Sequence, residues 1–487
     1  MTVLIDNAMS KPSIESINGE WATGPEYRTT DSPHPVWEAR TTPDWPRSNP
    51  PGSVVSNRTT TYLLRFVLLY VGIQLLPLDG QFFQNLFAVE GGYTRYLFNL
   101  SKFAPRFFGP VDTFANWGVV ALLAAVGAVI WTARKTGTTG DETVYSWLRI
   151  AVRYRLALAV IAYGFLKLFA IQAPLPSLSN LNTAYGDHSA WKLFSLSLGI
   201  VPGYQSFLGA VELTGGLLLL NRKTTVIGTL ILLPFLGNVF FSNLAYDGGE
   251  YVYSGFLLTF GLFLFGHDAV RLFRLVSLEA PAQPDRSVLV WTKEHQTVRW
   301  VLKGAFVLLV VGLYSFTTAA TGPKARFPRT AGLPGLAGIY RVTEFSQNGQ
   351  FISYSKTHPT RWQDVVFETW NTLSIRSNAP VRIHHVITEE LPAEEAARDY
   401  ELAGSQGRHY YRYTADASGK TLTLQNANPK DPADRLTLTL TRQTDSTLVL
   451  AGVTSRRDSI YARLTKVKKK YLLHEAAKAG RRGSLTL

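Results

Sequence analysis

The most prominent pattern along the chain is a series of long apolar segments separated by polar turns. A helix needs about 20 residues to cross the hydrocarbon core of a bilayer. Seven segments approach that length, at residues 60–76, 112–133, 150–172, 203–220, 224–244, 251–272 and 297–319. The first and the fourth are short, and we expect them to extend into the headgroup region. The pattern predicts an all-α polytopic membrane bundle over residues 60–320.

A second pattern begins after residue 320, where apolar and polar residues alternate. Segments such as GIYRVTEF, TLSIRS and RLTLTLTR have the period of two that is typical of half-buried strands. Turn sequences such as SQNGQ and DASGK separate them. We expect about eight to ten antiparallel strands in an all-β, barrel-like domain over residues 325–470. A short helix is expected to interrupt them at residues 389–404.

The ends of the chain and one loop differ from both patterns. Residues 1–59 are polar and rich in proline, which predicts a disordered tail, because such a segment buries too little apolar surface to fold alone. Residues 471–487 form a basic C-terminal tail that begins with a short helical pattern. The loop at residues 77–111 is rich in phenylalanine and contains several basic residues. It predicts one or two helices lying in the membrane interface, as an anchor or as a lid.

Basic residues in the short loops indicate how the bundle is oriented. Lysine and arginine accumulate in the cytoplasmic loops of membrane proteins. Here they follow the second, fourth and sixth apolar segments: Arg134, Lys135, Arg149, Arg222, Lys223, Arg271, Arg274, Arg286, Lys293 and Arg299. With seven spans these loops share one side, so we expect a cytoplasmic N-terminus in a bacterial inner membrane and an extracytoplasmic β domain. The net charge of +14 is interpreted in the same way, and no module for nucleic-acid binding is present.

Four polar residues interrupt the apolar segments: Lys167, Glu212, Asn238 and Asn243. At 1.5 Å per residue, the first three lie roughly 9–13 Å inward from the outer ends of their spans. A charge in hydrocarbon is costly unless it is paired, so Lys167 and Glu212 are expected to be partners. At the inner ends, Arg65, Arg153, Arg155 and Asp268 are interpreted as charges that reach toward the headgroups.

Small residues accompany the charged pair. Gly209 and Gly216 share one helix face with Glu212, and Gly164 lies one turn before Lys167. Small residues let a neighbouring helix approach closely, so Glu212 is expected to face protein and not lipid. Whether the pair only fixes the helix register or belongs to a binding site is left open. Further candidates, for the lining of an outward-facing vestibule, are Tyr185, Asp187, His188, Tyr204, Asp247 and Glu250.

Several kinds of chemistry have no basis in the sequence. The chain contains no cysteine, which excludes disulfides, thiol catalysis and iron–sulfur ligation. A haem between spans needs axial histidines inside the helices, and only His267 lies in an apolar segment. His384 and His385 are adjacent, so in a strand they point to opposite faces and cannot share one metal. We therefore assign no metal site and no catalytic residue, and whether the chain is an enzyme stays open.

Residues 150–270 resemble the DoxX family of bacterial membrane proteins. The matching segments are RLALAVIAYGFLKLF, with Arg155, Gly164 and Lys167, and GAVELTGGLLLLNRKT, with Gly209, Glu212, Gly215, Gly216 and Thr224. The resemblance implies a four-helix antiparallel bundle, and the named member of the family is the small subunit of a membrane thiosulfate:quinone oxidoreductase. The present chain differs from the family pattern by additional spans on both sides of this core and by its β domain. The segment LAGIYRVTEFSQNG also resembles lipocalin-like barrels, which can hold one apolar ligand or be filled by their own side chains.

Together these observations predict a membrane subunit of a redox or stress-response system, with Lys167 and Glu212 beside a quinone or proton site. No cofactor is evident from the motifs themselves, and quinone is the one compatible with the resemblance. The expected partners are the lipid bilayer and a redox protein or an apolar ligand. The alternative is a non-enzymatic module whose external barrel binds a lipid or a partner protein, with the bundle as its anchor.

Overall fold

The structure is a computed structural model that describes residues 58–87, 92–109, 112–134, 140–281, 293–325, 328–384, 395 and 398–479. The tail expected at residues 1–59 lies outside the described residues, except that residues 58 and 59 already belong to the first helix. Residues 480–487 of the expected basic tail lie outside them as well.

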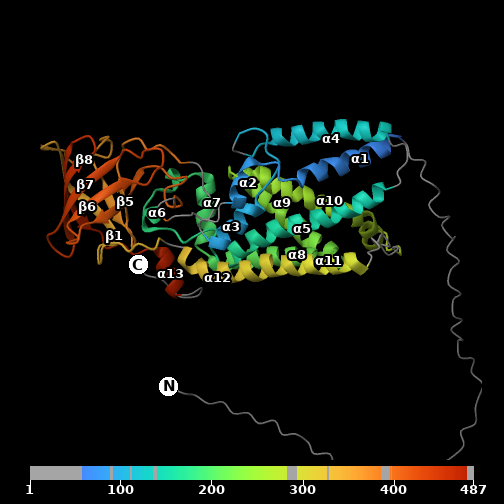
Figure 1. Ribbon diagram of the computed structural model, residues 1–487. Coiled ribbons are helices and arrows are strands. Elements are labelled where there is room, and N and C mark those ends of the chain that lie inside the picture. The colour runs from blue at the N-terminus through green and yellow to red at the C-terminus, as the bar shows by residue number, and fades with distance from the viewer. Residues whose placement is uncertain are drawn as a thin grey trace, which may run out of the picture. The chain divides into compact units, whose positions relative to one another are not determined.

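The first part of the described chain is helical (Figure 1). Its helices are α1 (Arg58–Gln74), α2 (Gly80–Phe87), α3 (Gly92–Ser101), α4 (Phe114–Arg134), α5 (Asp141–Leu168), α6 (Leu178–Leu181), η1 (Tyr185–Asp187), α7 (Ala190–Gly199), α8 (Pro202–Leu219), α9 (Thr225–Ala245), α10 (Tyr251–Ser277), α11 (Lys293–Phe306), η2 (Val307–Leu313) and α12 (Tyr314–Ala325). All of the predicted apolar segments are thus largely helical, and the loop at 77–111 contains two short helices, α2 and α3. The stretch η2 is a π-helical segment that joins α11 to α12.

Several of these helices could cross a membrane. In the described ranges, four helical stretches are long and apolar enough to do so: α4, α9, α10 and Gln296–Thr321, which comprises most of α11–α12. Helices α7 and α8 meet at 94° and would together make a fifth. Helix α1 has only 17 residues, and the first half of α5 contains several charged residues. The structure therefore supports a membrane protein with four or five such helices, and it does not establish the predicted count of seven.

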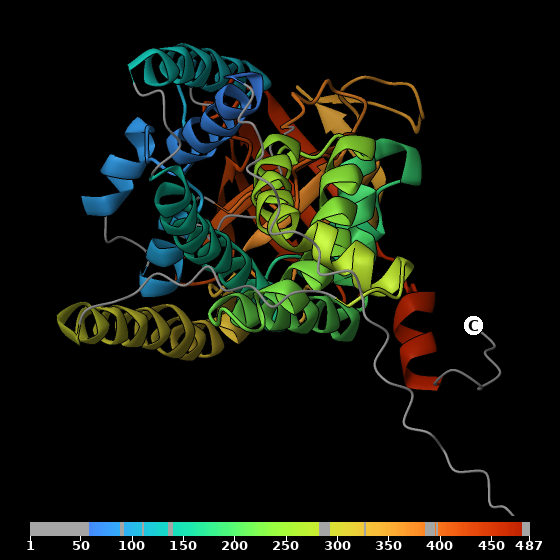
Figure 2. The same cartoon turned by 90° about the vertical axis from the view of Figure 1, so that its right-hand side faces the viewer.

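Helix α5 is the central element of the bundle. It is buried along most of its second half, and it packs against α1, α3, α8, α10 and α12. In Figure 2, which looks along the helices, α1 and α4 lie side by side as a pair at the edge of the bundle. The helix spans Asp141–Leu168, so the predicted segment 150–172 was placed too far toward the C-terminus. In its first turn, Asp141 pairs with Arg65 of α1.

The second part of the described chain is a closed antiparallel barrel. Its strands are β1 (Gly338–Gln347), β2 (Gln350–Phe351), β3 (Asp364–Phe367), β4 (Thr372–Arg376), β5 (Arg408–Ala415), β6 (Thr421–Asn426), β7 (Arg435–Arg442), β8 (Thr447–Thr454) and β9 (Ser459–Lys466), followed by helix α13 (Leu472–Ala479). Each barrel strand pairs with the next, and β9 pairs back with β1, which closes the sheet. The short β2 only extends β1 as a hairpin and lies outside the eight-stranded ring. The predicted barrel is confirmed.

The barrel interior is a packed hydrophobic core. The alternation along the strands directs one face inward, as along β7, where every second residue is buried. Tyr340, Phe345, Phe367, Leu450 and Leu464 are each at most 1% exposed and belong to one cluster. Of the two kinds of barrel that the sequence allowed, the described residues form the one filled by its own side chains. Half of the short helix expected at 389–404 lies outside the described residues. In the other half the prediction is wrong, because residues 400–404 form turns.

Candidate functional site

The two charged residues in the apolar helices form an ion pair. Lys167 lies in the last turn of α5 and Glu212 in the middle of α8. The Lys167 Nζ atom is 2.9 Å from Glu212 Oε2, and the two side chains are 12% and 4% exposed. In so little contact with solvent, each charge offsets part of the desolvation cost of the other.

Glycines bring the two helices close enough for this contact. A Cβ atom at Gly209 would lie 2.3 Å from the amide nitrogen of Leu168 and 2.6 Å from the carbonyl oxygen of Gly164. Gly216 meets side chains of α5 in the same way, while Gly215 faces Leu232 of α9. The small-residue face predicted for α8 is therefore the face that packs on α5.

Beside the ion pair lies a cavity of about 370 Å³, here called the Lys167 cavity. Residues from α5, α7, α8, α9 and α10 line it. Its aromatic wall consists of Tyr163, Trp191, Phe194, Tyr204, Phe235 and Tyr253. Its polar lining includes Lys167, Glu212, Asn238, Asn243 and Glu250. The four polar residues predicted from the apolar helices thus line one cavity, together with rings that suit a flat ligand.

The polar groups of this cavity can exchange hydrogen bonds with a ligand. The Lys167 ammonium lies over the rings of Tyr163 and Phe235, at 5.2 and 5.8 Å from their centroids. Asn243 is 4% exposed, and its amide nitrogen donates to the Val239 carbonyl. The side-chain oxygen of Asn243 is buried with no hydrogen-bond partner in the described part of the chain. This oxygen is covered by the chain near Gly248. Asn238, which lines the same cavity and is exposed, is the amide that is open to a ligand.

A second polar chain runs along the cavity wall. The Tyr163 hydroxyl donates a 2.7 Å hydrogen bond to Glu250, which also pairs with Lys102 of the loop after α3. Glu250 is the residue just before α10. Through Lys102, the loop at 77–111 contacts a residue that lines the cavity. Its role as an anchor or as a lid stays a prediction.

The predicted vestibule is assembled only in part. Tyr204 and Glu250 line the Lys167 cavity. Four of the predicted residues are not in its lining: Tyr185, Asp187, His188 and Asp247. Instead, His188 Nδ1 contacts the Ser405 hydroxyl at 2.9 Å, and the Asp187 carbonyl accepts a hydrogen bond from the Gln406 amide. The segment before α7 thus packs against the barrel domain.

This contact with the barrel was not anticipated from the sequence. Glu368, in the turn between β3 and β4, is 2% exposed. Its carboxylate accepts hydrogen bonds of 2.7 and 2.6 Å from the amide and the hydroxyl of Ser179, and one of 3.1 Å from the Leu178 amide. A carboxylate at the start of a short helix satisfies amides that have no partner within the helix. Burial nevertheless raises the pKa of Glu368, because these hydrogen bonds offset only part of the desolvation.

The same barrel region reaches helix α7, which forms one wall of the cavity. The Tyr400 hydroxyl is 3.2 Å from that of Ser195. Lys192 is fully buried, and it donates to the Tyr400 carbonyl and lies over the Tyr400 ring. Trp191, Phe194 and Ser195 line the Lys167 cavity. The barrel therefore holds in place a helix that shapes the cavity.

The raised pKa of Glu368 predicts a pH dependence of stability. The carboxyl of the native chain keeps its proton at pH values where the unfolded chain, with a pKa near 4.5, has lost it. The contribution of Glu368 to stability is therefore greatest below pH 4.5. It falls by about 1.4 kcal/mol per pH unit as the pH rises from the pKa of the unfolded chain to that of the native chain. Glu368→Gln should remove this loss, so its unfolding midpoint in detergent should change less between about pH 5 and pH 8 than that of the wild type.

Glu344→Gln is the matched control for this prediction. Glu344 also accepts a hydrogen bond, from Arg463, but it is 45% exposed, so its substitution should leave the pH dependence of the wild type intact. Equal pH dependence in the wild type and in Glu368→Gln would show that Glu368 is not the responsible group.

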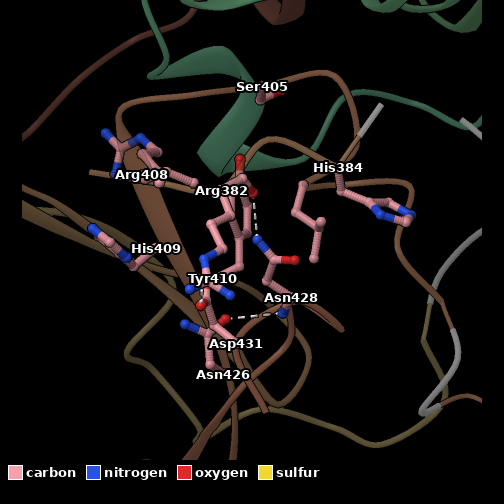
Figure 3. A pocket seen from close by; sticks show the side chains of 11 residues that line it. Arg382, His384, Ser405, Arg408, His409, Tyr410, Asn426, Asn428 and Asp431 are labelled. Carbon is pink, nitrogen blue, oxygen red and sulfur yellow. Dashed lines mark hydrogen bonds and ion pairs between the residues drawn. The ribbon is translucent and has the colours of Figure 1, made fainter. Parts of the chain in front are cut away.

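Other polar clusters in the barrel are too small or too sparse for a ligand. The hollow in Figure 3, near Arg408 and Asn428, has a volume of about 10 Å³, which is room for roughly one water molecule. His384 turns its ring away from the other side chains drawn there and pairs with Asp399 at 2.8 Å. Its neighbour His385 lies outside the described residues. Within the described ranges, no group of three or more candidate ligands could hold a metal ion.

Comparison of the chain with protein-family models, with curated proteins and with solved structures found no match. The geometry of the Lys167 cavity is therefore the basis on which a function can be proposed.

Proposed function

We propose that the chain is a DoxX-like integral membrane protein that binds a quinone in the Lys167 cavity, as the membrane subunit of a redox or stress-response system. The observation that supports this most directly is the Lys167–Glu212 ion pair beside an aromatic cavity of about 370 Å³. An ion pair that only locked two helices together would need no such space next to it.

The lining suits the chemistry of a quinone and its quinol. A quinone is a flat ring with two carbonyl oxygens, and the ammonium of Lys167 can donate a hydrogen bond to one of them. The side-chain oxygen of Asn238, an exposed residue of the cavity lining, can accept a hydrogen bond from a quinol hydroxyl. Reduction of a quinone consumes two electrons and two protons. The ammonium of Lys167 can supply one of these protons and solvent the other, and the electrons would come from a redox partner protein.

Binding of a short-chain quinone to the purified, detergent-solubilised protein tests the proposal. Lys167→Met removes the donor to the carbonyl and Glu212→Gln removes the charge that orients it. Each variant should weaken binding at least tenfold, because a hydrogen bond from a charged donor contributes about 1.5–3 kcal/mol. The measurement is quenching of tryptophan fluorescence by the quinone, since Trp191 lines the cavity.

Asp141→Asn is a matched control for Glu212→Gln. Asp141 forms an equally short buried ion pair with Arg65, 2.9 Å apart and at most 1% exposed, but neither residue lines the Lys167 cavity. If Asp141→Asn weakened binding as much as Glu212→Gln, the effect would be one of bundle stability. Unchanged binding in folded Lys167→Met and Glu212→Gln would refute the proposal.

We propose further that the bundle has seven spans in a bacterial inner membrane, with the N-terminus in the cytoplasm and the barrel outside. Basic residues at the ends of α4, α8 and α10 support this orientation. Because the chain contains no cysteine, the labelling of a single introduced cysteine shows on which side of the membrane that position lies. In intact cells a membrane-impermeant maleimide should label Ser446→Cys in the barrel, and it should label Lys223→Cys only after lysis. The reverse labelling pattern would show that the chain has the opposite orientation in the membrane.

A further inference from the structure

A second and larger cavity lies elsewhere in the bundle, here called the Arg153 cavity. Its volume is about 700 Å³. Three elements line it: the first half of α5, the turn between α8 and α9, and α11. None of its lining residues belongs to the Lys167 cavity. The proposed quinone site therefore leaves this cavity without a role.

The charge of the Arg153 cavity has a single sign. Among the residues that the structure describes, five basic side chains line it and no carboxylate does: Arg149, Arg153, Arg222, Arg299 and Lys303. Arg153 is only 8% exposed, and its Nε donates to the Leu219 carbonyl at 2.9 Å. Three of the other guanidinium groups repel its charge. Arg149 also lies 3.8 Å from Asp268, outside the lining. The predominance of positive charge around one hollow favours an anionic ligand.

The rest of the lining is apolar and continues into a membrane-spanning stretch. Trp147, Leu302 and Phe306 line the cavity together with Trp300. Trp300 and Leu302 are 66% and 65% exposed, and both belong to the apolar stretch Gln296–Thr321. Tryptophan beside basic residues at the end of an apolar helix is typical of the zone where lipid headgroups lie.

We propose that the Arg153 cavity binds an anionic phospholipid, with its phosphate among the arginines and its acyl chains along α11. A free phosphate ion satisfies the charges but leaves the apolar wall uncovered, whereas a phospholipid matches both. The charge of the lining favours anionic over zwitterionic lipids, because zwitterionic headgroups bring no net negative charge to the five cations.

Native mass spectrometry of the full-length protein, with added phosphatidylglycerol or phosphatidylcholine, tests this proposal. The double variant Arg222→Gln/Arg299→Gln changes two solvent-exposed cations, so it should fold. It should weaken phosphatidylglycerol binding at least tenfold, since each basic residue near a membrane surface contributes about 1 kcal/mol. Phosphatidylcholine binding should be weak and unaffected. Arg153→Met, which removes the buried cation, should weaken phosphatidylglycerol binding in the same way.

Arg274→Gln serves as the control, because this exposed arginine of α10 lies outside the cavity. An equal loss in Arg274→Gln would show that binding follows overall charge, and it would overturn the proposal. Displacement of the bound lipid by millimolar inorganic phosphate would also overturn it, in favour of a site for soluble phosphate. Retention of the lipid in phosphate, with loss only in the cavity variants, is the expected result.

Discussion

Replacement of Gly209 by alanine should strongly destabilise the helical bundle. The added Cβ atom would lie 2.3 Å from the Leu168 amide nitrogen and 2.6 Å from the Gly164 carbonyl oxygen. Both are backbone atoms, so no rotation of a side chain can relieve the clash. Helices α5 and α8 would have to separate, which also pulls Lys167 away from Glu212. We expect a loss of about 1–3 kcal/mol or more, measured as the shift of the unfolding midpoint in detergent.

Gly237→Ala in α9 is the matched control. No described atom lies within 4 Å of a Cβ built at this position, and the residue is in the middle of a comparable apolar helix. Alanine favours the helix over glycine by up to about 1 kcal/mol, so this variant should be as stable as the wild type or slightly more. If Gly209→Ala were equally stable, the α5–α8 contact would be looser than the structure has it.

The residues near Lys167 could be predicted because their signal is local. A charged residue in an apolar helix is conspicuous, and the spacing of Gly209, Glu212 and Gly216 places them on one helix face. The alternation of the strands likewise predicted the barrel, since period-two patterns with turn sequences between them depend only on neighbouring residues. The role of these residues as a binding site stays a prediction.

Contacts between residues that are distant in sequence could not be predicted. Arg65 was interpreted as a charge that reaches toward the headgroups, yet it is fully buried and pairs with Asp141 of α5. Glu368 and Ser179 meet across 189 positions of the chain, and nothing in the sequence near either one indicates the other. The contacts of Asp187 and His188 with the barrel domain could not be predicted for the same reason, because they depend on tertiary structure.

Helix α7 was missed because its pattern is weak. It has only 10 residues, too few for a span, and two of its polar residues, Lys192 and Ser195, contact Tyr400 of the barrel domain. Lys192 is an example, since a lysine in a short apolar segment normally indicates an exposed position, whereas here it is fully buried against Tyr400. The shape of the Lys167 cavity depends on this helix, so the sequence predicted its polar residues but not its walls.

Replacement of Arg408 by methionine should have the largest effect expected in the barrel domain. Arg408 is 2% exposed at the start of β5. Its guanidinium pairs with Asp364 and donates to the Ser374 hydroxyl and the Asn182 carbonyl. The substitution leaves the Asp364 charge, 16% exposed, without this partner. Removal of one partner of a buried pair costs about 3–5 kcal/mol, so the unfolding midpoint should fall sharply.

Arg463→Met removes one partner of a second arginine–carboxylate pair in the same barrel. Arg463 lies 2.9 Å from Glu344, but the two side chains are 42% and 45% exposed. Water and salt screen such a pair, so its loss should cost at most about 1 kcal/mol. Because Arg408 also bonds to Asn182, in the segment before α7, only Arg408→Met should increase proteolysis of that segment under native conditions. Equal stability of the two variants would show that the buried contacts of Arg408 contribute little.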